Sequence, residues 1–232
     1  MDSNCAVKMP SMARVAMRGA AAMVLMLASS SALAQATSRP CNADDLDNGR
    51  PGPACLLAHA PLGKPGADAL YWSLYNYPTV EAARAESGNG SVVNAFGKIW
   101  LFTVGPIGTR PPNGQHIADV GPMSVDRGVS YDAEFLQSIF SPGMTAPVHV
   151  HSGPEAFYAV SGDTCLETPD GVQVGRGAGN SMTVRGGPPM LLMALGPEPR
   201  KGFALILHDA SLPPTTLVHH WAPKGLCQAE RR

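Results

Sequence analysis

The sequence predicts an all-β protein, and two observations support this. Only 15% of the 232 residues are charged, while 25 are Gly and 22 are Pro, a composition typical of short strands joined by turns rather than of long helices. Apolar stretches of about five to ten residues recur between these turn residues, and several of them alternate with polar residues as half-buried strands do. The length suits one domain with a substantial core, and the sequence contains no internal repeat.

The stretch 142–162, PGMTAPVHVHSGPEAFYAVSG, contains the strongest candidate site. Residues 148–151 are predicted to form a strand, so His149 and His151 point to the same face. A Ser-Gly-Pro turn then reverses the chain, and Glu155 begins the next apolar strand beside the two imidazoles. Two neutral nitrogens and one carboxylate on one face suit a divalent first-row metal ion. Two histidines in a strand are also common as an ordinary surface or hydrogen-bonded pair, so the spacing of the whole stretch matters.

That spacing resembles the first motif of the cupin superfamily at five positions: Gly143, His149, His151, Glu155 and Gly162. The second motif is expected one short strand later, and the glycine spacing of 179–190 (GNSMTVRGGPPM) matches it. Two positions depart from it: Arg185 stands where the family usually has proline, and Met190 stands where it usually has a third metal-binding histidine. The resemblance covers roughly residues 130–210.

The resemblance implies a double-stranded β-helix, or jelly-roll, cupin barrel with extra N-terminal strands and one short helix. It also implies a divalent metal ion (Fe, Mn, Zn or Cu) held by His149, His151 and Glu155, with Met190, Phe157 and His208 expected in the pocket. A thioether at position 190 is a weak, soft ligand that favours Cu(I), so the resemblance leaves occupancy and identity of the metal open. His208 ends a core strand and is either a hydrogen-bonded buried histidine or a group near the barrel mouth.

Residues 1–34 have the features of a secretory signal peptide. Lys8, Arg14 and Arg18 give a positive start, and the apolar run AAAMVLMLA is far shorter than the ~20 residues that span a bilayer. Residues 32–34 (ALA) fit a cleavage site, which makes Gln35 the new N-terminus. An uncleaved membrane anchor is the alternative. The sequence thus predicts a periplasmic or secreted protein with no membrane attachment after cleavage.

Cleavage leaves four cysteines, and an even number in an exported protein favours disulfides. Cys41 with Cys55 is the simplest local pair, and Cys165 with Cys227 would then tie the C-terminal tail to the barrel. One bridge with two free thiols is the alternative. No pair has the CxxC spacing of a structural zinc site.

In chain order, the sequence predicts an extended N-terminal arm at 35–68, a single barrel at 69–210 and a C-terminal tail at 211–232 that packs on the barrel. Strands are expected at 69–77, at 91–104 with a break near Gly97, at 116–120 and at 131–140. A short helix is expected to begin after Thr79 and end near 87. A hairpin is expected around the turn at 168–171, with closing strands at 190–195 and 203–208 joined by a polar turn at 196–202. The aromatic residues of 69–104 are expected to pack the sheet rather than to stack on a ligand.

Several functional classes lack support in the sequence. A formal charge of −1 without a basic stripe gives nucleic-acid binding no electrostatic basis. No GxSxG, SxxK or phosphate-loop motif is present. The leading hypothesis is a metal-binding cupin that acts on a small organic molecule, as a dioxygenase or isomerase would. Its rival is a metal-free cupin that binds a small ligand without catalysis. The sequence does not choose between a monomer and a homodimer.

Overall fold

The computed structural model describes residues 35–36, 38–42, 45, 51–108, 111 and 113–230. Their central element is a five-stranded antiparallel sheet of order β12-β9-β14-β7-β2. Its strands are β2 (Gly52–Gly63), β7 (Tyr131–Phe140), β9 (Glu155–Ser161), β12 (Ser181–Val184) and β14 (Arg200–Asp209). Side chains alternate across it, so each strand contributes to two different layers.

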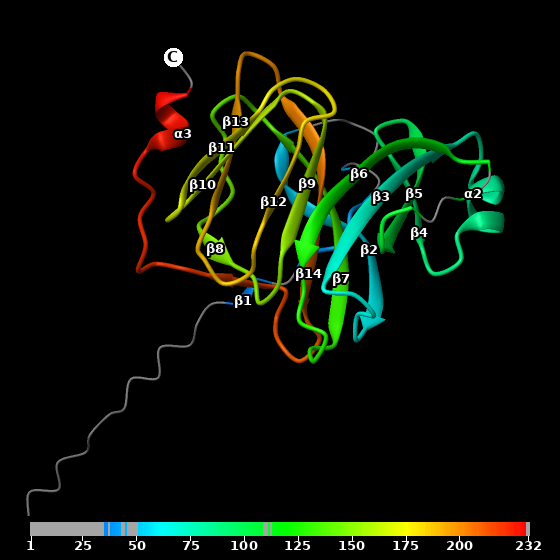
Figure 1. Ribbon diagram of the computed structural model, residues 1–232. Helices are drawn as coiled ribbons and strands as arrows, with labels where there is room; N and C mark the ends of the chain where they lie inside the picture. Colours follow the sequence, from blue (N-terminus) through cyan, green and yellow to red (C-terminus); the bar gives the residue numbers. More distant parts are fainter. Residues whose placement is uncertain are drawn as a thin grey trace, which may run out of the picture. The chain divides into compact units, whose positions relative to one another are not determined.

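One face of this sheet packs against a four-stranded sheet of order β4-β5-β3-β6, which lies beside it in Figure 1. These strands are β3 (Ala69–Tyr77), β4 (Ser91–Ala95), β5 (Lys98–Gly105) and β6 (Gln115–Ser124), and the short helix α2 (Val80–Glu86) follows β3. Large aromatic side chains fill the interface. Phe102 contacts Trp72, Phe135 and Phe203 with ring centroids 5.1–5.4 Å apart. The expectation that the aromatic residues of this segment pack the sheet is confirmed for Trp72, Trp100 and Phe102, which are buried in this core.

The opposite face of the five-stranded sheet forms the inside of a barrel. A three-stranded sheet of order β11-β10-β13 lies across from it, and an apolar cluster that includes Phe140, Phe157, Leu166 and Leu192 fills the space between them. These strands are β10 (Asp163–Thr168), β11 (Gly171–Gly175) and β13 (Leu191–Leu195). A second three-stranded sheet of order β1-β15-β8 adds β1 (Gln35–Ala36), β8 (His149–Val150) and β15 (Thr215–Leu217).

The C-terminal tail is anchored on the outside of β10. Cys165 forms a disulfide with Cys227 of the short helix α3 (Leu226–Ala229), and the Glu167 carboxylate accepts hydrogen bonds from the backbone N–H groups of Lys224 and Cys227. Figure 1 shows α3 beside β10 and β11. Cys41 and Cys55 form the second disulfide, so both predicted bridges are confirmed.

The sequence-based prediction of the elements holds for two strands and for the short helix. The strands at 69–77 and 131–140 have the expected bounds, and Thr79 caps α2 by accepting from the Ala82 N–H group. The region 35–68 differs, because its residues 52–63 form β2 rather than an extended arm. This strand contains Pro53 and Pro61, which a central strand would not tolerate, but β2 is an edge strand whose pairing with β7 is irregular at both prolines.

The predicted signal peptide, residues 1–34, lies outside the described residues. Within the part of the chain that the structure describes, no helix has the length and apolar character needed to cross a membrane.

Candidate metal centre

The metal-binding candidates are placed by a tight turn between β8 and β9. His149 opens β8, His151 follows it, and Glu155 opens β9, with the turn Ser152-Gly153-Pro154 between them. The turn presses against β14, because a Cβ atom at Gly153 would lie 2.3 Å from the backbone oxygen of Leu207. Only glycine fits there, so the sequence of the turn allows the close packing of the β8–β9 connection on β14.

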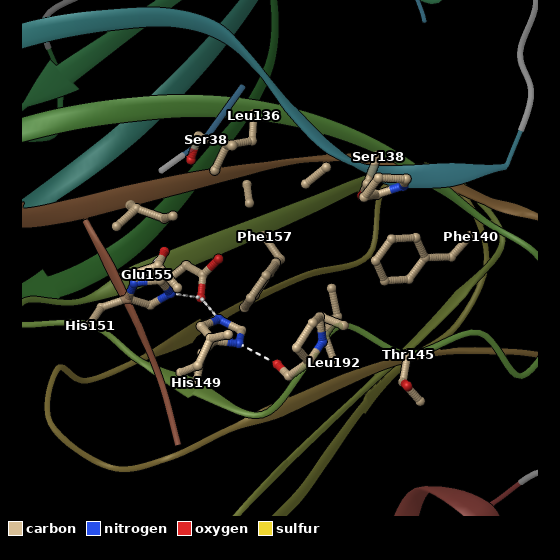
Figure 2. Close-up of a pocket in the computed structure, with 18 of the residues that line it drawn as sticks. Ser38, Leu136, Ser138, Phe140, Thr145, His149, His151, Glu155, Phe157 and Leu192 are labelled. Atoms are coloured by element: carbon tan, nitrogen blue, oxygen red, sulfur yellow. Dashed lines mark hydrogen bonds and ion pairs between the residues drawn. The ribbon is translucent and has the colours of Figure 1, made fainter. Parts of the chain in front are cut away.

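The three side chains converge on one point, as Figure 2 shows. Glu155 Oε2 lies 3.0 Å from His151 Nε2 and 3.9 Å from His149 Nε2. The three candidate ligand atoms all lie within 4.8 Å of one another. His149, His151 and Glu155 are buried, with exposed fractions of 9%, 2% and 4%. The sequence prediction that these three residues share one face is therefore confirmed by their geometry.

Backbone carbonyls fix the orientation of both imidazoles. His149 Nδ1 donates to the Pro147 carbonyl at 2.6 Å, and His151 Nδ1 donates to the carbonyl of Pro214, which precedes β15. Since a carbonyl only accepts, each Nδ1 carries a hydrogen, and in the neutral ring each Nε2 presents a lone pair to the cavity. Metal-binding histidines are commonly oriented in this way.

In this orientation two hydrogen-bond acceptors, His151 Nε2 and Glu155 Oε2, face each other. Neither His151 Nε2 nor Glu155 Oε2 has a hydrogen bond of good geometry among the described residues, although the two atoms are only 3.0 Å apart. A neutral imidazole lone pair and a carboxylate oxygen repel each other at that distance, so a proton or a metal cation is required between them. A donor set of two imidazoles and one carboxylate fits Fe(II), Mn(II), Zn(II) or Cu(II).

Burial and charge act differently on the two histidines. Burial disfavours the charged form of His151, but the Glu155 carboxylate and the Pro214 carbonyl outweigh it, so the pKa of His151 is raised. Burial and the neighbouring His151 charge together lower the pKa of His149. The raised pKa of His151 favours a proton on this ring beside Glu155, at the position where a metal cation would otherwise balance the carboxylate.

This exchange predicts a pH dependence of metal affinity. Below the raised pKa of His151 the ring is protonated and a metal must displace that proton, so affinity falls as the pH is lowered. Zn(II) titrations by calorimetry between about pH 8 and about pH 5 are expected to show weaker binding at each acidic step and release of protons on binding. An affinity that does not change across this range would contradict the displacement of a proton from His151.

The cluster lies at one end of a cavity of about 420 Å³. Most of the wall is apolar, and its principal side chains are Leu136, Phe140, Met144, Phe157, Leu192 and Ile206. Ser38 and Arg39, which precede Cys41, also line it, and Ser38 Oγ donates to the buried Glu134 carboxylate at 2.7 Å. The Cys41–Cys55 disulfide thus holds part of the cavity rim in place.

The three further pocket residues expected from the sequence occupy different places. Phe157 lines the cavity, two residues after Glu155 on the same strand. Met190 pairs with His149 through two backbone hydrogen bonds, is fully buried in the apolar cluster inside the barrel and does not line the cavity. His208 is buried on β14 with Nδ1 donating to the carbonyls of Asp209 and Leu212, and it too is absent from the cavity wall.

Sequence reasoning missed two groups near the cavity. Ser138 lines the cavity from β7, and Arg200 donates a hydrogen bond to it from β14. Arg200 lies at the end of a polar, Gly- and Pro-containing segment that predicts an exposed turn, so no local signal marks it as buried. Alternation along 131–140 does place Ser138 on the same face as Leu136 and Phe140, which was a usable signal.

The histidine motif thus lies on the inner face of an antiparallel barrel, with the glycine-containing turn between its two strands, as the resemblance of the sequence implies. The chain folds as an all-β antiparallel barrel, the architecture that the sequence resemblance implies. The four-stranded sheet β4-β5-β3-β6 supplies the extra N-terminal strands on the outside of this barrel, and α2 is the one short helix expected there.

Comparison of this chain with known proteins finds similar solved structures but no similar sequence family. No family model matches the sequence, and no curated protein matches it. A structure of oxalate oxidase is 19% identical over 37% of this chain and 46% of that chain, with a TM-score of 0.32. A cupin-like protein from Thermotoga maritima is 14% identical over 37% of this chain and 64% of that chain, with a TM-score of 0.34.

An RmlC-like cupin family protein from Methanocaldococcus jannaschii is 16% identical over 32% of this chain and 67% of that chain, with a TM-score of 0.30. This chain spans less than half the length of the oxalate oxidase chain that it matches. At such low identities and TM-scores, these likenesses carry no argument about the activity of this chain.

Proposed function

We propose that this chain is an exported cupin that binds a divalent first-row metal ion through His149, His151 and Glu155, and that a small organic molecule enters the cavity beside it. The observation that carries the proposal is the buried meeting of two imidazole Nε2 atoms and one carboxylate oxygen, which requires a cation. Two disulfides support export to the periplasm or the cell exterior, where such bonds persist. N-terminal sequencing of the exported protein, expected to begin at Gln35, tests this part.

The protein residues have distinct tasks in this proposal. His149 and His151 hold the metal with lone pairs fixed by the Pro147 and Pro214 carbonyls, and Glu155 neutralises part of its charge. The apolar wall around Phe157 and Leu192 excludes water and receives the body of the ligand. A bound divalent ion would supply a Lewis acid with open coordination positions, which suits a dioxygenase- or isomerase-type reaction.

Metal titration of the wild-type protein tests the proposal. The full chain, purified without a histidine tag and stripped with a chelator, is expected to bind one equivalent of Zn(II) or Mn(II) in calorimetry. Metal analysis of protein taken directly from its native compartment identifies the ion that it carries there. Absence of binding for every first-row divalent ion would reject the proposal.

The alternative, a metal-free cupin that binds a small ligand, is supported by two observations. Apart from the histidines and Glu155, the cavity wall is largely apolar, and Met190, at the position of the third metal-binding histidine of the family, is buried away from it. On this alternative the proton on His151 is the permanent partner of Glu155. The same titration separates the two functions, since only the first predicts metal binding.

A further inference from the structure

A buried arginine lies behind the cavity wall at some distance from the metal centre. Arg200 is the first residue of β14, pairs with Phe140 of β7 and has an exposed fraction of 1%. Its guanidinium lies along the inside of β14, where Gly202 leaves room for it. A Cβ atom at Gly202 would come within 3.0 Å of Arg200 Nη2, so a side chain at that position would displace the guanidinium or the strand.

This guanidinium is incompletely paired. Arg200 Nε donates to Thr164 Oγ1 at 2.8 Å and Nη1 donates to Ser138 Oγ at 3.2 Å, whereas Nη2 has no partner among the described residues. Both partners are neutral hydroxyls, and within the part of the chain that the structure describes no carboxylate forms an ion pair with Arg200. Burial lowers the pKa of Arg200 to about 10, partly offset by the charge of Glu155, so the group remains charged at neutral pH. A buried cation without a counter-ion costs several kcal/mol.

Ser138 links the buried guanidinium of Arg200 to the cavity through a hydrogen bond. Its side chain lines the cavity, and its oxygen accepts a hydrogen bond from Arg200. The serine hydroxyl hydrogen is therefore available to a hydrogen-bond acceptor inside the cavity. An acceptor placed there would also feel the positive guanidinium directly behind the serine.

The serine and the metal centre mark two separate ends of the cavity. Ser138 pairs with Gly202 of β14, while Glu155 pairs with Ile206 of the same strand. Four residues of strand separate these pairs, which corresponds to roughly 13 Å. Figure 2 shows Ser138 and Phe140 on one side of the cavity and the two histidines with Glu155 on the other. The wall between them is mostly apolar, with Phe157 and Leu192 labelled there.

We propose that the cavity selects a small amphipathic monocarboxylate, whose acid group accepts a hydrogen bond from Ser138 in front of Arg200 and whose apolar body extends toward His149, His151 and Glu155. The inference deepens the proposed function, since it rests on the same cavity as the ligand site. It assigns Ser138 as a binding residue and Arg200 as the positioning residue behind it. The carboxylate would supply the counter-charge that Arg200 lacks within the protein.

The test compares acids with their uncharged amides in the chelator-treated, metal-free full chain. Hexanoate and hexanamide form one probe pair, and benzoate and benzamide form the other, each titrated by calorimetry. The wild type is expected to bind the acid about tenfold more tightly than the amide, since hydrogen bonds to charged groups are stronger than neutral ones. The preference is expected to disappear in Arg200→Met and in Ser138→Ala.

Two further variants make the test specific. Arg185→Met removes an exposed arginine whose partner is the exposed Asp170, and it is expected to keep the full acid preference. His151→Ala distinguishes a carboxylate bound at Ser138 from one bound to a protonated imidazole. The acid preference is expected to survive in His151→Ala. Its loss there, together with its retention in Arg200→Met, would overturn the proposal.

Folding of the variants is measured alongside. Arg200→Met is expected to fold with an unchanged or higher melting temperature, because replacing a buried ion by an apolar side chain of similar volume is often neutral or stabilising. A lower melting temperature with an unchanged acid preference would show a merely structural arginine and overturn the proposal. If Arg200→Met does not fold, the ratio of acid affinity to amide affinity in Ser138→Ala tests the proposal instead. Since no metal is present, failure of this inference and failure of metal binding are separate results.

Discussion

Replacing His151 with alanine is expected to lower the affinity for Zn(II) or Mn(II) by more than about 100-fold, because loss of a ligand exceeds the 10–100-fold effect of losing an outer-shell partner. His151 is the nearer histidine to Glu155, and its Nδ1 hydrogen bond to Pro214 fixes the ring in the ligating orientation. Without it, His149 and Glu155 offer two ligand atoms 3.9 Å apart. Calorimetric titration of the variant and the wild type at the same pH measures the loss.

His59→Ala is the matched control for this variant. His59 is a half-exposed histidine that pairs with Asp132 across β2 and β7, outside the residues that line the cavity. Its removal is expected to leave metal affinity unchanged. Equal losses in His59→Ala and His151→Ala, or wild-type affinity in His151→Ala, would contradict the assigned site.

Removing the Cys165–Cys227 disulfide is expected to lower the free energy of unfolding by about 4 kcal/mol, according to the loop-entropy relation. The bridge closes a loop with a sequence separation of 62, and both cysteines are fully buried in a cluster with Met193 and Leu195. Urea unfolding of the double variant Cys165→Ala/Cys227→Ala, compared with the wild type under oxidising conditions, gives the difference.

The other disulfide provides the comparison. Its sequence separation is 14, for which the same relation gives about 3 kcal/mol. Cys41→Ala/Cys55→Ala should therefore destabilise less, yet it should weaken ligand binding more, because Ser38 and Arg39 at the cavity rim precede Cys41. A larger stability loss in this variant than in the variant without the Cys165–Cys227 bridge would contradict the assignment of the longer bridge as the main covalent stabiliser.

The site was largely predictable from sequence because its parts are local. His149, His151 and Glu155 lie within seven residues, and strand alternation with one turn is enough to bring them together. The same holds for the strands at 69–77 and 131–140, whose side chains pack on both faces. Both disulfides followed from taking Cys41 with Cys55 as the simplest local pair once export was assumed, although one bridge with two free thiols stayed open at that point.

The features that the sequence did not reveal depend on residues that are distant from one another in the chain. Arg200 is buried and donates to Ser138 and Thr164 on two other strands, and its own segment gives no sign of this. The strand β2 was obscured by its prolines, which the structure tolerates only at the edge of the sheet. Position in a sheet is a property of the whole chain, so composition alone could not provide it.

The small sheet β1-β15-β8 has a consequence for the order in which the molecule forms. Gln35 pairs with Thr216, and Leu217 pairs with His149, so this sheet joins segments from both halves of the described chain. Contacts of such high sequence separation close late in folding and slow it, because the intervening chain must be ordered first. Pro214, which orients His151, directly precedes β15. We therefore expect the barrel core to form before the metal centre is complete, with the ligand geometry reached once β15 has paired with β8.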